Sequence, residues 1–186
     1  MRKNIGVHTF LYPQPVLMIA TFDKDGNPDC MNAAWGGISD TNKITIAISA
    51  SHKTTKNILE TKAFTISPAT KKYVKECDYL GIASGNDIKD KLKACGLHAT
   101  KSELVNAPII EEFPLTLICK LVSYDTTSEI LVGETINISV DESVLTNNKI
   151  DVDKLEPISF DPVNNAYLLV KEKVGNAFKD GLVFKK

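Results

Sequence analysis

The chain has 186 residues, of which 43% are hydrophobic and 24% charged, and its formal net charge is −1. This length and composition are typical of one globular domain with its own core, so we expect a single domain over residues 1–186. The near-neutral charge argues against nucleic acid or an anionic membrane surface as a partner.

A β-hairpin is the first predicted element. Residues 16–22 and 27–34 are strand-like, and they flank Asp23–Gly26, whose Asp-Gly step supplies the positive φ of a tight turn. Residues 43–49 alternate strictly between isoleucine and small or polar residues. This period is typical of a half-buried strand.

Three short helices are predicted, over residues 54–61, 70–79 and 87–95. Thr54 is the expected N-cap of the first helix, and Gly96 is the expected stop of the third. Between the first two helices, residues 63–67 have strand character until Pro68 ends it.

The longest predicted strands lie in the second half of the chain. Residues 115–124 and 129–140 are rich in branched and apolar side chains and flank the turn Asp125–Ser128, so they should form an antiparallel pair. Residues 141–160 are polar and predicted to be irregular. Residues 166–171 are predicted as the last strand.

These elements predict a mainly β fold: a closed or nearly closed antiparallel barrel with a few short flanking helices. A doubly wound sheet would need regular helices between its strands. The chain also contains no GxGxxG or GxxxxGK[ST] segment, so the sequence gives no support to a standard dinucleotide or P-loop site.

Location and redox state follow from what the sequence lacks. Its longest apolar run, residues 16–20, is far too short to cross a bilayer, and residues 1–4 lead into no signal-peptide core, so we expect a cytoplasmic protein with no membrane partner.

The four cysteines form no CxxC pair, so no metal site is predicted. We interpret them as reduced thiols, with a redox role for Cys30 or Cys77 as the alternative.

The segment between the alternating strand and the first helix is suited to an anion. Hydroxyl groups, one lysine and the free N–H groups of a helix start converge there, and all of them favour a phosphate. The alternative is a plain surface turn with a helix cap. The candidate residues of this segment are Ser49, Ala50, Ser51, His52, Lys53, Thr54, Thr55 and Asn57.

Two further segments are candidates for ligand contact. Asn32, Ala33, Ala34 and Trp35 combine an amide, small residues that let the backbone approach a flat ligand, and the chain's single tryptophan. The alternative is a strand end with a core tryptophan. The other segment, residues 84–91, is a polar loop that opens a helix and indicates little by itself.

In this order, the segments resemble the flavin reductase-like family, the FMN-binding split barrels that include flavoredoxin and NAD(P)H:flavin oxidoreductases. The similarity covers residues 13–134 and most of the chain. The matching motifs are Pro13–Val16, the strand 17–22, Asp25–Asp29, Asn32–Trp35, Lys53–Ile58, Ser84–Gly85, Asp90–Lys91, Ala107–Glu111 and Gly133–Glu134.

The resemblance implies an antiparallel Greek-key split β-barrel that binds FMN, acts as a homodimer and transfers electrons from NAD(P)H or a protein donor to an acceptor. The cofactor carries the chemistry, so no catalytic side chain is predicted. The alternative is a non-catalytic FMN-binding carrier or sensor. Pyridoxamine-phosphate oxidase chemistry has less support, because Arg2 is the only arginine.

The resemblance also assigns roles to the candidate residues. Asn32–Trp35 would run along the flavin ring, and Asn57 would support the phosphate loop. The phosphate would rest on Ser49, Ser51, Lys53, Thr54 and Thr55, and Ser84, Gly85 and Lys91 would complete the site.

One departure from the family concerns the electron donor. Many members carry an Asp-His pair, associated with the nicotinamide side of the site, where this chain has Ser128–Glu129.

Overall fold

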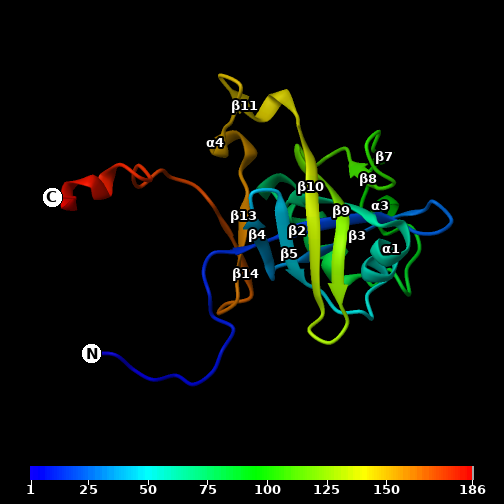
Figure 1. Ribbon diagram of the computed structural model, residues 1–186, viewed down its shortest axis with the longest axis horizontal. Helices are drawn as coiled ribbons and strands as arrows, with labels where there is room; N and C mark the ends of the chain where they lie inside the picture. Colours follow the sequence, from blue (N-terminus) through cyan, green and yellow to red (C-terminus); the bar gives the residue numbers. More distant parts are fainter. Residues whose placement is uncertain (186) are drawn as a thin grey trace.

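The computed structural model describes residues 1–185, and its main feature is a curled, seven-stranded antiparallel sheet (Figure 1). Its strands, in spatial order, are β3 (Pro28–Ala33), β2 (Leu17–Phe22), β6 (Ala63–Pro68), β9 (Leu115–Asp125), β10 (Ile130–Val140), β5 (Lys43–Ala47) and β4 (Gly36–Asp40). The two edge strands, β3 and β4, are consecutive in the chain, so two residues join the two edges of the sheet. The predicted mainly β, split-barrel fold is confirmed.

The predicted β2–β3 hairpin is confirmed, and its turn shows why it forms. Gly26 has a φ of +82°, and the Asp23 carboxylate accepts the backbone N–H groups of Asp25 and Asn27 at 3.0 and 2.9 Å. A positive φ at glycine and an Asp side chain that closes the turn are the usual requirements of such a connection.

The barrel interior explains two further sequence features. Ile44 and Ile46, predicted to share one face, are both buried there with Phe64. A Cβ on Gly133 would overlap the Phe64 ring, so a glycine is needed where β10 passes over it. Irregular pairing between β9 and β10 on either side of this region lets the long hairpin bend around the core.

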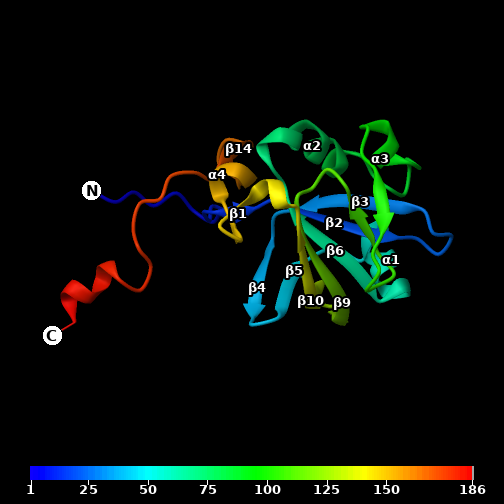
Figure 2. The ribbon, with the colours of Figure 1, turned by 90° about the horizontal axis from the view of Figure 1, so that it is seen from above.

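A second core lies on the outer side of β2 and β3. There Met18 and Cys30 pack against Cys77 and Leu80 of α2 (Val74–Ile82) and Leu92 of α3 (Lys91–Ala94). Figure 2 shows both helices on that side of the sheet. Because β2 is covered on both faces, its first four residues, Leu17–Ala20, are all apolar instead of alternating.

The helices differ from the prediction at their ends. Helix α1 (Lys53–Thr61) begins after His52, and not after Thr54, because the Thr54 hydroxyl donates to the buried Asp29 carboxylate. The predicted helix over 87–95 is reduced to α3. Residues before it form turns, and Asp90 has a left-handed φ of 50°, which interrupts a helix. The helix predicted from residue 70 is α2, preceded by the 3-10 turn η1 (Lys71–Tyr73).

The remaining elements are short. Residues 141–160 were predicted to be irregular, but they contain several of these elements, because Asp141 and Asp151 cap two turns with their carboxylates. The elements are β1 (Gln14–Pro15), β13 (Ile158–Asp161) and β14 (Ala166–Leu169) in one small sheet, the pairs β7 (Ala99–Lys101) with β8 (Pro108–Ile110) and β11 (Leu145–Thr146) with β12 (Lys149–Ile150), and the turns or helices η2 (Glu142–Val144), α4 (Val152–Leu155) and η3 (Asp180–Phe184).

Both ends of the chain leave the barrel from the small β1–β13–β14 sheet. We call residues 1–12 the N-terminal arm and residues 171–185 the C-terminal arm; both extend away from the barrel (Figures 1 and 2). Within residues 1–185, no helix is both long and apolar enough to span a bilayer.

Candidate functional site

Two adjoining hollows bring most of the predicted site residues together. The apolar hollow, of about 460 Å³, lies between residues 31–35, the loop 47–52, the β9–β10 turn and Phe160. The polar hollow, of about 350 Å³, lies between the start of α1 and the loop after α2. Met31, His52 and Gly81 line both, so the two hollows form one continuous surface.

The positions of the predicted residues divide between these hollows. Asn32, Ala33, Ala34, Trp35, Ser49 and His52 line the apolar hollow, and Ser51, His52, Lys53, Thr54, Ser84, Gly85 and Lys91 line the polar one.

The polar hollow is positive at the N-terminus of α1. Lys56 is the first residue whose N–H donates back to the helix start, to the His52 carbonyl at 3.2 Å. The N–H groups of the preceding turn therefore have no acceptor within the helix and give this end a partial positive charge. Lys53 adds an ammonium group, which lies 3.4 Å from the Asp23 carboxylate.

The loop opposite α1 approaches closely because of Gly85. A Cβ at this position would lie 2.6 Å from the Asp29 carboxylate oxygen, so a larger residue would push the loop away from β3. The Asn86 side-chain amide donates to the Ser51 carbonyl at 3.3 Å and ties the two walls of the hollow together.

A buried ion pair forms the floor of the polar hollow. Asp29 and Lys91 are 4% and 3% exposed, and the Lys91 ammonium lies 3.3 Å from the Asp29 carboxylate. The ammonium also donates to the Ala83 carbonyl at 3.0 Å, and the second Asp29 oxygen accepts the Thr54 hydroxyl at 3.0 Å. Lys91 is thus committed to holding α3 and the 84–85 loop against β3.

The apolar hollow offers a flat wall. Trp35 is 57% exposed and lines the hollow, which contradicts the alternative of a core tryptophan. Phe160 of β13 lines the same hollow. The Asn32 amide does not face open space: it donates to the Cys77 carbonyl at 3.0 Å and ties β3 to α2.

Glu129 is a site residue that the sequence reasoning did not assign. Its carboxylate accepts the Ser49 hydroxyl at 2.8 Å and the Ala50 N–H at 2.9 Å. These two hydrogen bonds, first the Ala50 N–H and then the Ser49 hydroxyl, lower the pKa of Glu129, with a further contribution from His52. The only signal in the sequence was that Ser128–Glu129 replaces the family's Asp-His pair.

Three predicted contact residues support the loop from behind and line neither hollow. The Ala50 N–H is used by Glu129, and the Thr55 hydroxyl donates to the Ser49 carbonyl at 2.7 Å. The Asn57 amide donates to the Thr21 hydroxyl on β2 at 3.0 Å. Asn57 therefore joins α1 to the barrel.

The thiols are poorly suited to redox chemistry. All four cysteines are free. Burial raises the pKa of Cys77 to about 12 and that of Cys119 to about 11, and it also raises the pKa of Cys30. Because the thiolate is the reactive form, these side chains act as small apolar core residues.

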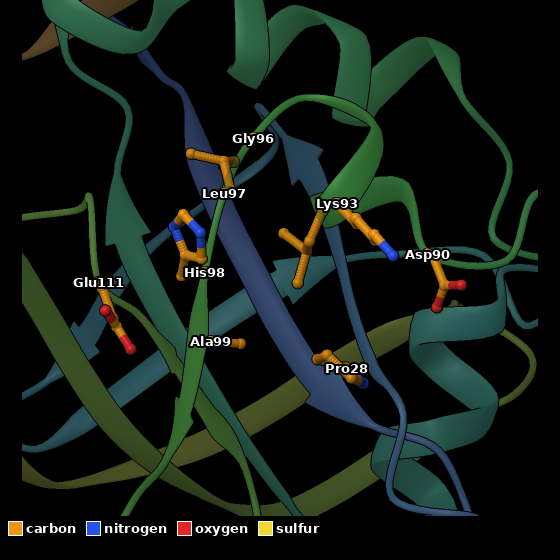
Figure 3. A pocket seen from close by; sticks show the side chains of 9 residues that line it. Pro28, Asp90, Lys93, Gly96, Leu97, His98, Ala99 and Glu111 are labelled. Carbon is orange, nitrogen blue, oxygen red and sulfur yellow. The ribbon is translucent and has the colours of Figure 1, made fainter.

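A further hollow, of about 490 Å³, lies beside α3 and β7 and contains none of the predicted residues. Figure 3 shows Asp90, Lys93, His98 and Glu111 around it. Positive and negative groups alternate there, and the His98 ring faces Glu112 at 2.7 Å. This mixed charge gives it no preference for a phosphate.

Comparisons with known proteins agree with the resemblance seen in the sequence. The family model described as "Flavin reductase like domain" matches residues 9–159. The structure is similar to flavoredoxin of Desulfovibrio vulgaris (Miyazaki F), with 36% identity, coverage of 97% of this chain and 100% of that chain, and a TM-score of 0.92.

Two more solved structures extend the comparison. Flavoredoxin from Methanosarcina acetivorans is 27% identical, with 98% and 100% of the two chains covered and a TM-score of 0.87. An FMN-binding domain of a flavin reductase-like enzyme from Shewanella baltica OS155 shares the fold, at 19% identity, 88% and 89% coverage and a TM-score of 0.79. The chain belongs to the flavin reductase-like family.

Proposed function

We propose that the protein binds FMN across the two hollows and passes electrons from a donor to an acceptor. The observation that carries the proposal is the division of one continuous surface into a positive end, at the start of α1, and a flat apolar end beside Trp35. A phosphate suits the first end and an aromatic ring suits the second. The Desulfovibrio and Methanosarcina flavoredoxins support this choice of ligand class.

The residues fit an FMN molecule in specific ways. Ser51 and Lys53 line the polar hollow beside the helix N–H groups and would hold the phosphate, together with the Ser84–Gly85 loop. Thr54 and Lys91 would support these residues from below without binding the phosphate themselves, because the Thr54 hydroxyl and the Lys91 ammonium are already bonded to the Asp29 carboxylate. Residues Ala33–Trp35 and Phe160 would bound the ring and exclude water from it.

When bound, FMN supplies a ring that accepts electrons and releases them one or two at a time. The chain's own part is to bind, to orient and to set the electrostatic surroundings. Glu129 places a negative charge on the wall of the apolar hollow, where it holds the Ser49–Ala50 loop.

We favour a protein donor over a nicotinamide nucleotide. The dinucleotide carries several negative charges, and Glu129 adds another at the hollow where its nicotinamide would have to enter. The carboxylate would repel the dinucleotide, whereas it would weaken the binding of a compact redox protein less.

The location that we propose is the cytoplasm.

The single tryptophan provides a direct test. FMN titrated into the protein should quench the fluorescence of Trp35 to saturation, and the Trp35→Phe variant should bind FMN with no such signal. Under anaerobic conditions, the bound flavin should bleach with photochemically supplied electrons, while NADH and NADPH should reduce it slowly. Absence of any flavin binding would refute the proposal, and rapid bleaching by NADH or NADPH would refute the preference for a protein donor.

A second candidate function is a carrier or sensor in which FMN is held without turnover. Because FMN would carry the chemistry, neither function needs a catalytic side chain from the protein. A flavin that stays oxidised in the presence of photochemical reductant and mediators would favour this second function.

A further inference from the structure

A pair of charged side chains closes the polar hollow toward the β2–β3 turn. The Lys53 ammonium lies 3.4 Å from the Asp23 carboxylate, and the two side chains are only 23% and 16% exposed. The stem of Lys53 also lies against the loop after α2, since a Cβ on Gly85 would be only 3.0 Å from Lys53 Cδ. Lys53 therefore bridges the gap between that loop and the turn.

The β2–β3 turn holds Asp23 in this position. One carboxylate oxygen accepts the backbone N–H groups of Asp25 and Asn27, and the Asn27 side-chain amide donates to both oxygens at 3.2 Å. Desolvation alone would raise the pKa of Asp23, but these hydrogen bonds and the charge of Lys53 outweigh it and lower the pKa. The Asp23 carboxylate is therefore ionised at neutral pH and fixed in direction.

A smaller hollow, of about 250 Å³, adjoins the polar hollow at this pair, and we call it the acidic hollow. Lys53 and Asp29 line both hollows, whereas Asp23 lines only the acidic one. The other charged residues that line the acidic hollow are Asp25, Lys89 and Asp90. Even with Asp23 paired to Lys53 and Asp29 paired to Lys91, two carboxylates remain against one ammonium. The acidic hollow therefore repels a negatively charged group.

A second contact closes the polar hollow between α1 and the loop after α2. The Asn86 side-chain amide donates to the Ser51 carbonyl at 3.3 Å, and its oxygen accepts the Lys56 ammonium at 3.5 Å. A phosphate at the start of α1 would thus be bounded by the Asn86 contact and by the Lys53–Asp23 pair. The space around it suits a group at which the ligand ends.

FMN and FAD differ at this end of the molecule. FMN ends in a phosphate monoester, whereas in FAD the same phosphate continues into a second phosphate and an adenosine. We propose that the Lys53–Asp23 pair and the acidic hollow restrict the site to flavins that end in a monoester, so that the protein binds FMN and rejects FAD. A second phosphate would have to separate Lys53 from Asp23 and approach the carboxylates beyond them, and such a repulsive element is a common source of specificity. This inference rests on the proposed function.

The test compares the dissociation constants of FMN and FAD for the full-length chain by titration calorimetry. The test variant combines Asp23→Asn with Asp25→Asn. The first substitution keeps a side-chain oxygen that can accept the N–H groups of the turn, and the second creates the Asn-Gly step that such turns favour. The matched control combines Asp87→Asn with Asp153→Asn, which removes the same charge from two exposed positions that line neither hollow.

We expect wild-type protein and the control to bind FMN at least about tenfold more tightly than FAD. In the test variant this ratio should fall at least about fivefold, because two negative charges near the second phosphate are removed, and FMN binding should not weaken, because Lys53 keeps its charge. Equal affinity of wild-type protein for both flavins would overturn the inference and leave the proposed function standing. A test variant that keeps the wild-type ratio, or a control that loses it equally, would also overturn the inference. Binding of neither flavin would refute the proposed function and the inference together.

Discussion

Replacing Lys91 with methionine should strongly destabilise the protein. The substitution keeps much of the side-chain length but removes the ammonium that lies 3.3 Å from the Asp29 carboxylate and 3.0 Å from the Ala83 carbonyl. Asp29 would remain buried, with the Thr54 hydroxyl as its side-chain hydrogen-bond donor. Breaking a buried pair in this way costs about 3–5 kcal/mol of the free energy of unfolding.

Urea denaturation followed by circular dichroism measures this loss. The exposed Lys89 provides the control, because Lys89→Met removes the same charge from the loop just before α3 and leaves the Asp29 pair in place. Adding Asp29→Asn to Lys91→Met should recover at least about 1 kcal/mol, since the neutral side chain no longer needs a counterion. A Lys91→Met protein within about 1 kcal/mol of wild type would mean that the pair is no stronger than a surface ion pair, and the reasoning would fail.

Three other substitutions test separate parts of the structure. Gly133→Ala should lower the thermal midpoint, because its Cβ would overlap the Phe64 ring in the core and cost about 1–3 kcal/mol; an unchanged midpoint would contradict this packing. The hydrogen bond to Glu112 raises the pKa of His98 above 6.5, so the pair stabilises the fold at pH below the ordinary histidine pKa, and this contribution is lost as the pH rises through the raised value. In Glu112→Gln the His98 pKa, followed by NMR, should fall back toward 6.5, and no change would refute the pairing. Glu129→Gln should tighten FMN binding about two- to fivefold by removing a negative charge near a helix N-terminus, and a titration in which binding weakens would assign the carboxylate a purely supporting role.

Local patterns were sufficient for much of the fold. The Asp-Gly turn predicted the β2–β3 hairpin, and strict alternation predicted β5, because in both cases neighbouring residues determine the backbone. The edge strand β4 was missed, since Gly36–Gly37 carries no alternation and the strand depends on pairing with β5. Helix α3 was predicted too long because the left-handed Asp90 gives no clear signal in the sequence.

The site was predictable only as a set of segments. The loop at residues 49–57 could be identified from its hydroxyl groups and its place before a helix. Its contacts could not, because Glu129 lies 80 residues from Ser49 along the chain. The same holds for Lys91, which lines the polar hollow as a predicted site residue but whose pairing with Asp29 the sequence did not indicate. Long-range partners of this kind are determined by the topology of the sheet.

The buried trio of Asp29, Thr54 and Lys91 has a consequence for the history of the sequence. Changing any one of them alone leaves a polar group of the others without its partner in the floor of the polar hollow. In related sequences these three positions should therefore have changed together. Across related flavin reductase-like chains, we expect an uncharged residue at the position of Asp29 wherever an apolar residue occupies that of Lys91.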